Sequence, residues 1–469
     1  MRYLTCALLV VHLMIDEYLD RNSPSIEQFH ELLQPYKTEF GAILLRDYHE
    51  LLKKYEIAEM LSEDFKFSTS YLLHYAWEKL HTGHWKNVNI CWRVLYASIK
   101  LLTVLYSLRK SINENKTQCN SYNYCHIQYT ELICELDYSL IMGYSIFDSF
   151  AAKLATELHK CITLRSQESV VCSEDKYSDD TFQLDKDNFE MEILNETMTN
   201  MNMNKLARVS CPSLEMFNNL MKLGRPFIIT NAINFWPAYH QHNWTLKYWK
   251  DNFGHRLVPV EIGSKYTEEN WGQKLMTIND FINNYFTSNN EKQTNIMKGY
   301  LAQYEIFSQI PELESDIHIP DYCTLTGDAF DDDTNNANAV CVDDIHIDTN
   351  IWFGPKGTVS PLHHDNDRAN LLSQVKGFKY VVLYEASQTV YLYAYDDNML
   401  SNTSKVDIEK PDLNKYPEFV KASGFYGILG PGEMLYIPPR CWHYVRSLSA
   451  SFSVNFWWDV VPSLIPPWQ

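Results

Sequence analysis

The stretch IWFGPKGTVSPLHHDNDRANLLSQVKGFKYVVLY, residues 351–384, contains the pattern that decides both the fold and the chemistry. His363 and Asp365 stand two positions apart, and residues with this spacing in an extended strand point to the same face. His443 lies in a second β-rich stretch, GPGEMLYIPPRCWHYVRSLSASFSVNFWW, residues 430–458. Two histidines and one carboxylate with open positions beside them form the facial triad that suits Fe(II). For His363 and Asp365 alone, the alternative interpretation is a polar pair without a metal.

Lys379 strengthens the metal interpretation, because it stands inside the apolar strand pattern GFKYVVLY, residues 377–384. A buried ammonium group is costly unless it is paired. A dicarboxylate with one end on the metal would supply that pair. Ser360 and Asn370 add polar groups to the same region. The alternative is that Lys379 lies at a sheet edge with its charge in water.

These residues resemble the JmjC (jumonji C) class of Fe(II)- and 2-oxoglutarate-dependent oxygenases. The resemblance extends to both ends of the chain. It is carried by YAWEKLHTGHW (75–85), GRPFIITNA (224–232), VPVEIGSKYTEENW (258–271), GYLAQYEIF (299–307), IPDYC (319–323), NTSKVDIEKPDL (402–413) and SFSVNFWW (451–458). One departure concerns NDRAN, residues 366–370, which is one residue longer than the usual spacing of the family and leaves the role of Asn370 open.

The resemblance implies an α+β chain, in which an α-helical N-terminal domain precedes a double-stranded β-helix (jelly-roll or cupin) domain with supporting helices. It implies Fe(II), 2-oxoglutarate as cosubstrate and O2, with the metal on His363, Asp365 and His443. The residues implied for the cosubstrate are Tyr300, Ser360, Asn370, Lys379 and Trp457. Those implied for the substrate are Glu261 and Trp271, because a carboxylate beside an aromatic ring suits a guanidinium group. Trp352 and Trp457 would flank the metal, and Asn455 is a further candidate for cofactor contact.

The function that the resemblance implies is hydroxylation of arginine side chains in proteins by an Fe(IV)-oxo oxidant. Two alternatives stay open at this point. The same oxidant would demethylate a methyl-lysine of a histone, and a JmjC fold without activity would serve as a binding scaffold. Structural packing is the competing explanation for Trp271 and Tyr300, and hydrogen bonding within the sheet is the competing explanation for Asn455.

The composition of the chain limits which classes of binding partner we expect. The 469 residues carry a formal net charge of −19, which disfavours general binding to DNA phosphates and favours basic proteins or peptides. The eleven cysteines are scattered without a CxxC pair, as is typical of reduced thiols in the nucleus or cytoplasm. The apolar N-terminal run resembles a short signal peptide but lacks a small-residue cleavage pattern. We expect no membrane span.

We expect three parts along the chain. Residues 1–165 show helical periodicity, 166–205 form an acidic flexible linker, and 206–469 form the JmjC catalytic domain. In the catalytic domain, CPSLEMFNNLMKLG (211–224) predicts a helix that ends before Gly224. TVYLYAY (389–395) predicts a strand, as do the apolar runs around it. The acidic segment 326–348 predicts a flexible insertion; its Asp331, Asp333 and Asn335 do not fit a calcium loop.

Overall fold

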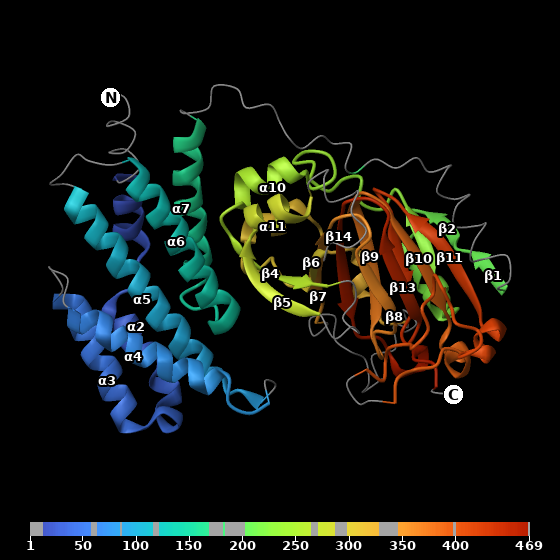
Figure 1. Cartoon of the computed structure of the whole chain (residues 1–469), viewed down its shortest axis with the longest axis horizontal. Helices are drawn as coiled ribbons and strands as arrows, with labels where there is room; N and C mark the ends of the chain where they lie inside the picture. Colours follow the sequence, from blue (N-terminus) through green and yellow to red (C-terminus); the bar gives the residue numbers. More distant parts are fainter. Residues whose placement is uncertain are drawn as a thin grey trace.

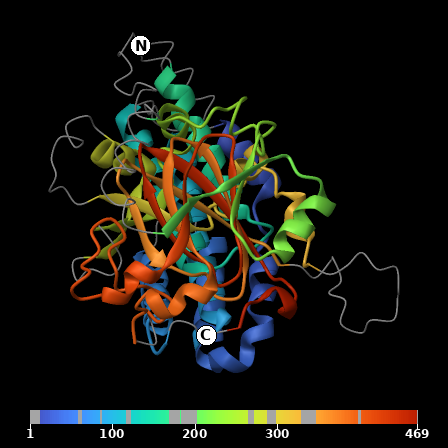
Figure 2. The ribbon, with the colours of Figure 1, turned by 90° about the vertical axis from the view of Figure 1, so that its right-hand side faces the viewer.

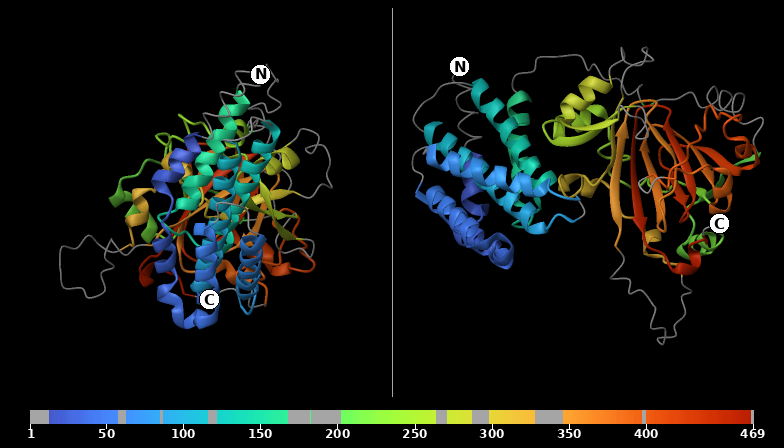
Figure 3. Two further views of the ribbon diagram at one scale, coloured as in Figure 1. Left: turned by 90° about the vertical axis from the view of Figure 1, so that its left-hand side faces the viewer. Right: turned by 60° about the horizontal axis from the view of Figure 1, so that its bottom comes forward.

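The computed structural model describes residues 13–57, 63–84, 87–115, 122–167, 182, 202–263, 271–286, 298–327, 346–396 and 400–467. A helical domain lies at one end and two β-sheets lie at the other, with a small layer of helices and strands between them (Figure 1). Figure 3 shows the helical domain beside the sheets rather than over their faces. The expected α+β organisation is therefore confirmed, whereas most of the segment expected to be a linker lies outside the described residues.

The helical domain is built around one long apolar helix. Its elements are α2 (Ile26–Leu32), η1 (Gln34–Tyr36), α3 (Lys37–Ile57), α4 (Glu63–Leu80), α5 (Ile90–Asn115), α6 (Tyr122–Tyr138), the π-helical turn η3 (Ser139–Gly143) and α7 (Phe150–Gln167). Helix α2 begins at a capping box, in which Ser25 and Gln28 each accept a backbone hydrogen bond from the other. Helix α5 packs against α4, α6 and η3. By length and composition, its segment Ile90–Asn113 would also suffice to cross a membrane, but 61% of the window that meets this criterion is buried, as in a core helix.

The two sheets form the double-stranded β-helix. The order of the first is β1 (Asn202–Lys205), β11 (Ser423–Leu429), β10 (Lys379–Tyr384), β13 (Trp442–Ser447) and β8 (Val359–His363). The order of the second is β2 (Ala207–Ser210), β3 (Phe227–Thr230), β12 (Met434–Ile437), β9 (Ala369–Lys376), β14 (Ser451–Trp458), β7 (Asp348–Gly354), β6 (Gly299–Tyr304), β4 (Leu257–Ile262) and β5 (Gly272–Thr277). Figure 2 looks onto these strands with the helical domain behind them.

An apolar core joins the two sheets, and the strands that contribute to it are buried along nearly their whole length. Val381 and Leu383 of β10 pack with Leu372 of β9 and with Leu435 and Ile437 of β12. Helices and turns cover the outside. They are α9 (Leu214–Lys222), α10 (Leu246–Phe253), α11 (Ile278–Tyr285), η5 (Pro311–Asp316), η6 (Asp321–Thr324), η8 (Ala386–Tyr391), η9 (Pro417–Lys421) and η10 (Pro462–Leu464).

Two segments show where local patterns succeeded and failed. The helix predicted in 211–224 is α9, which Ser213 caps by accepting a hydrogen bond from the backbone of Met216. The strand predicted for 389–395 is wrong, because this segment forms the end of η8 and then bends. Tyr393 has a φ of 50°, which interrupts extended backbone. The segment still buries an apolar side chain without forming a strand, because Leu392 is fully buried.

A buried ion pair fastens the helical domain to the catalytic domain. Asp137 of α6 accepts hydrogen bonds from Arg256 at 2.7 and 3.0 Å and from the backbone N–H of Leu257 at 2.6 Å. The exposed fractions of the two side chains are 0% for Asp137 and 1% for Arg256. Arg256 also donates to the carbonyl of Gln309, so its donors reach two other segments of the chain. The pair stands directly before β4, which places the helical domain on the strand layer that carries Glu261.

Replacing Asp137 with alanine is expected to lower the free energy of unfolding by about 3–5 kcal/mol, because the variant leaves the Arg256 charge buried without its partner. Urea unfolding followed by circular dichroism measures this change. Glu50→Ala is the control, because Glu50 pairs with Lys53 on the surface of α3, and it should leave the unfolding midpoint nearly unchanged. Equal midpoints for Asp137→Ala and the unmutated chain would contradict a fastening role for the pair.

Candidate functional site

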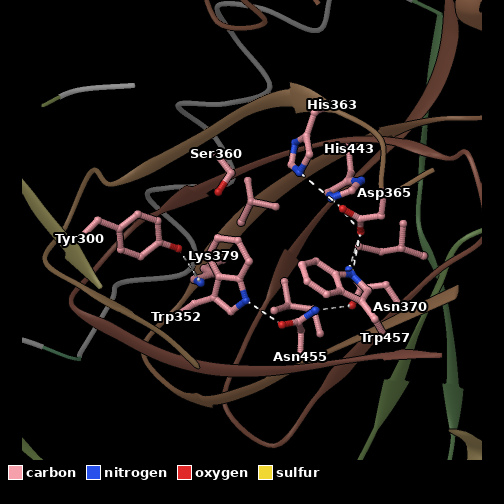
Figure 4. A pocket seen from close by; sticks show the side chains of 13 residues that line it. Tyr300, Trp352, Ser360, His363, Asp365, Asn370, Lys379, His443, Asn455 and Trp457 are labelled. Atoms are coloured by element: carbon pink, nitrogen blue, oxygen red, sulfur yellow. Dashed lines mark hydrogen bonds and ion pairs between the residues drawn. The ribbon is translucent and has the colours of Figure 1, made fainter. Parts of the chain in front are cut away.

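Three predicted metal ligands converge between the sheets. His363 ends β8 and His443 lies on β13, and the two residues are direct partners in the antiparallel pairing of these strands. Asp365 follows β8 by two positions. Potential ligand atoms of the three residues lie within 4.8 Å of one another. Nε2 of His363 is 3.7 Å from Oδ1 of Asp365, and Nε2 of His443 is 3.6 Å from Oδ2. The predicted convergence is present in the geometry (Figure 4).

Backbone contacts orient both imidazole rings. The Nδ1 atom of His363 lies 2.7 Å from the carbonyl of Pro361, and that of His443 lies 3.1 Å from the carbonyl of Cys441. Each Nδ1 therefore carries the proton, which leaves the lone pair on Nε2. Burial, followed by the neighbouring His443, lowers the pKa of His363 to about 4, so its ring is neutral at physiological pH. A neutral imidazole with its lone pair on Nε2 is the form that ligates a divalent metal.

Hydrogen bonds hold the carboxylate of Asp365 at one of its two oxygens. Its Oδ2 accepts hydrogen bonds from Nδ2 of Asn370 at 2.7 Å and from Nε1 of Trp457 at 3.0 Å. Burial alone would raise the pKa of Asp365, but His443, His363 and these two donors together lower the pKa below its ordinary value. The charge and the orientation of this donor set fit a divalent ion of the facial-triad type.

The three residues stand in the wall of one pocket of roughly 360 Å³, a volume that includes its open mouth. Side chains from both sheets line it (Figure 4). The lining consists of Tyr300, Trp352, Ser360, His363, Asp365, Asn370, Leu372, Lys379, Ile437, His443, Val445, Asn455 and Trp457. All the residues predicted for the cosubstrate are in this set. The apolar Leu372, Ile437 and Val445 were missed by sequence reasoning, although their place in alternating strands was a usable signal.

Lys379 supplies a buried cation to the pocket. Its exposed fraction is 1%, and its Nζ lies 3.4 Å from the hydroxyl of Tyr300. Tyr300 also hydrogen-bonds with Ser360. Within the described ranges, no carboxylate of the chain forms an ion pair with Lys379, and burial lowers the pKa of the lysine to about 7. Lys379 therefore lies in the interior, as expected. Its buried ammonium group would be stabilised by an anionic group of a ligand.

The two residues predicted for the substrate lie beside the pocket rather than in its wall. Nε1 of Trp271 donates a hydrogen bond to Glu261 at 3.2 Å, and Glu261 of β4 pairs with Tyr300 of β6. Trp271 is 38% exposed, so its ring is accessible from outside. Burial raises the pKa of Glu261, with an opposing contribution from the Trp271 hydrogen bond. Glu261 and Trp271 thus form a half-buried acidic and aromatic pair next to the cosubstrate region.

Comparisons with known proteins agree with this geometry. Residues 213–463 match the model of the family described as "Cupin-like domain". The chain is 40% identical over 390 residues to "Lysine-specific demethylase 8" of Danio rerio, an alignment that covers 83% of this chain and 86% of the relative. It is 34% identical over 404 residues to "Lysine-specific demethylase JMJ30" of Arabidopsis thaliana, with coverage of 82% and 84%.

A third relative has a name without an activity. The chain is 33% identical over 402 residues to "Jumonji C domain-containing protein 5" of Drosophila melanogaster, with coverage of 85% of this chain and 88% of the relative. Oxygenases of the JmjC type use Fe(II), 2-oxoglutarate and O2, and the two histidines and one aspartate found here suit that chemistry. The family model, the long alignments and the jelly-roll fold lead to one conclusion: this chain belongs to the cupin-like JmjC family of oxygenases.

Proposed function

We propose that this chain oxidises basic side chains of protein substrates, and that His363, Asp365 and His443 hold its Fe(II). The observation that carries the proposal is that two imidazole Nε2 atoms and one carboxylate face one another in a pocket where, within the described residues, no carboxylate of the chain pairs with the buried Lys379. The bound iron would supply the redox chemistry with O2. The chain's own groups bind, orient and exclude water around it.

The cosubstrate would be held at its two ends. The far carboxylate of 2-oxoglutarate suits Lys379, because a charge-assisted bond compensates the buried ammonium group. Tyr300 stands next to that ammonium group, and Ser360 hydrogen-bonds with Tyr300, so both offer hydroxyl groups to the cosubstrate. One N–H of Asn370 is committed to Asp365, and within the described residues its second N–H has no partner in the chain, so it would serve the cosubstrate. Trp457 contributes its ring to the wall while its N–H is bonded to Asp365.

Two substrate chemistries have support from different observations. Two relatives are named lysine-specific demethylases, which favours removal of a methyl group from lysine over the arginine hydroxylation that we predicted first. The Glu261 and Trp271 pair supports arginine, because a carboxylate binds a guanidinium group in two-point fashion while an indole ring stacks on it. Relatives named as demethylases also support action in the nucleus.

One assay separates these chemistries. Methylated-lysine peptides and arginine peptides are incubated with the full chain, Fe(II), 2-oxoglutarate and O2, and succinate is quantified with mass spectrometry of the peptide. Loss of a methyl group identifies the demethylase, and gain of one oxygen atom on arginine identifies the hydroxylase. Peptide-dependent succinate release that is absent, or that equals the release by His363→Ala, would leave only a binding scaffold.

Replacing Glu261 with glutamine is expected to raise the KM for a basic peptide roughly 10- to 100-fold, since a hydrogen bond to a charged group contributes about 1.5–3 kcal/mol. The affinity for 2-oxoglutarate should change little, because Glu261 does not line the cosubstrate pocket. Steady-state kinetics with varied peptide measures the effect. Glu215→Gln, on the exposed face of α9, is the control. An unchanged peptide KM in Glu261→Gln would remove this residue from substrate binding.

A further inference from the structure

A chain of side-chain hydrogen bonds leads from the pocket wall to the metal-binding carboxylate. Nε1 of Trp352 donates to Oδ1 of Asn455 at 2.9 Å. Nδ2 of Asn455 donates to Oδ1 of Asn370 at 3.2 Å, and Nδ2 of Asn370 donates to Oδ2 of Asp365 at 2.7 Å. Figure 4 shows these side chains in sequence along one side of the pocket. They come from three neighbouring strands, β7, β14 and β9.

The donor-to-acceptor direction of this series of hydrogen bonds is fixed by Trp352. An indole N–H donates and cannot accept, so Asn455 must present its oxygen to Trp352. Its amide nitrogen then faces Asn370, which must answer with its own oxygen. The nitrogen of Asn370 is thereby forced toward Asp365. A flipped amide at either asparagine would place two donors or two acceptors against each other in the interior, which is costly because the two asparagines are 1% and 5% exposed.

The second donor to Asp365, the indole N–H of Trp457, also has a fixed direction. It reaches the same oxygen, Oδ2, at 3.0 Å. One carboxylate oxygen thus receives two donors of fixed direction. Each oxygen faces one imidazole, since Oδ1 lies 3.7 Å from Nε2 of His363 and Oδ2 lies 3.6 Å from Nε2 of His443. Within the described part of the chain, only Oδ2 also accepts hydrogen bonds from side chains, so the hydrogen bonding of the two oxygens is unequal.

We propose that Asn455, directed by Trp352, is a positioning residue that restricts Asp365 to one metal-binding oxygen. This inference rests on the proposed function. A carboxylate that binds through one oxygen leaves three of six octahedral positions open beside two imidazoles, enough for a two-point cosubstrate and O2. A carboxylate that binds through both oxygens would occupy one of these positions. In this role Asn455 acts through Asn370, as a support of the ligand set.

The test uses the full chain and Mn²⁺ as the probe. Affinity is measured by the electron paramagnetic resonance signal of free Mn²⁺, and open positions by the water-proton relaxation that the bound ion causes. Asn455→Leu is expected to bind Mn²⁺ roughly 10- to 100-fold more weakly. Per bound ion, its relaxation enhancement is expected to fall by about one third, as one of three open positions is lost.

Trp352→Phe removes the N–H that sets the direction and keeps a smaller aromatic ring in the pocket wall, and it should shift both readouts the same way. The double variant should be no worse than Asn455→Leu, because both changes act through one chain of contacts. Ser453→Ala is the matched control. Ser453 is buried on the same strand and donates to Gln374, which is not part of this series of hydrogen bonds. The Mn²⁺ affinity and the relaxation enhancement of Ser453→Ala should therefore match those of the unmutated protein.

The outcomes separate the two proposals. If the unmutated chain binds no Mn²⁺, the proposed function itself fails. If it binds Mn²⁺ and Asn455→Leu shows the same affinity and relaxation, the positioning role is refuted. If Asn455→Leu does not fold, Trp352→Phe decides alone, and unaltered relaxation in that variant refutes the inference.

Discussion

Replacing His363 with alanine is expected to weaken Mn²⁺ binding by more than about 100-fold, because a lost ligand costs more than the 10- to 100-fold seen for supporting residues. Release of succinate from 2-oxoglutarate should fall to the level without enzyme. The fold should persist, since the three proposed ligands form a cluster of buried and half-buried polar groups whose partial removal relieves desolvation. Metal titration and circular dichroism on the same sample measure both expectations.

The adjacent His364 is the matched control for this variant. It is also buried, but its ring packs edge-on against Trp442 with a centroid distance of 4.7 Å, and its Nδ1 accepts a hydrogen bond from the backbone of Asn366. His364→Ala should retain the metal affinity within a few-fold and lose stability instead. Similar metal affinities for His363→Ala and the unmutated chain would refute the proposed ligand set.

Replacing Lys379 with methionine is expected to weaken 2-oxoglutarate binding roughly 100-fold, since loss of one partner of a buried charged pair costs 2–5 kcal/mol. Mn²⁺ binding should stay within a few-fold, because Lys379 is not among the ligand atoms. The stability of the ligand-free protein should rise by about 1–4 kcal/mol as a buried ammonium group is replaced by an apolar chain. Isothermal titration and urea unfolding measure these opposite effects. Equal cosubstrate affinity would exclude Lys379 from the carboxylate site.

The pH dependence of this affinity provides a second check on Lys379. Burial lowers its pKa to about 7, so above pH 7 the ligand-free lysine is mostly neutral. Binding of a carboxylate then requires uptake of a proton, and the affinity should fall by up to about tenfold per pH unit above 7. Below pH 7 the lysine is already charged, and its contribution should be constant. Lys379→Arg should show a flat profile over the same range, because a guanidinium group stays protonated.

The folding stability of the ligand-free protein changes with pH in the opposite direction to the cosubstrate affinity. The folded protein holds Lys379 at a pKa below its unfolded value of 10.5, so the unfolded chain binds more protons between about pH 7 and 10.5. This lysine therefore destabilises the ligand-free fold most below pH 7, and the cost disappears as the pH rises through that window. A cosubstrate anion that holds the lysine charged would remove the same cost at neutral pH.

Local patterns identified the main elements because their signals are short-range. The apolar run of β10 and the capping serine of α9 act within a few residues, and the predicted elements are present. The failure at 389–395 has the same origin, because an alternating aromatic pattern also fits a 3-10 turn followed by a bend. Strand β5 was not predicted, because its sequence, GQKLMT, is mostly polar and its partner β4 is what holds it extended.

The sequence by itself determined the donor set: the HxD spacing, a later histidine and a lysine in an apolar strand are chemical facts of the chain. Only the tertiary structure decided that His363 and His443 face each other across β8 and β13, since pairing between distant strands depends on the whole sheet. It also decided that, among the described residues, one oxygen of Asp365 accepts two side-chain hydrogen bonds and the other accepts none. That inequality arises from indole and amide groups on three strands, whose hydrogen-bond directions exist only when the strands are packed together.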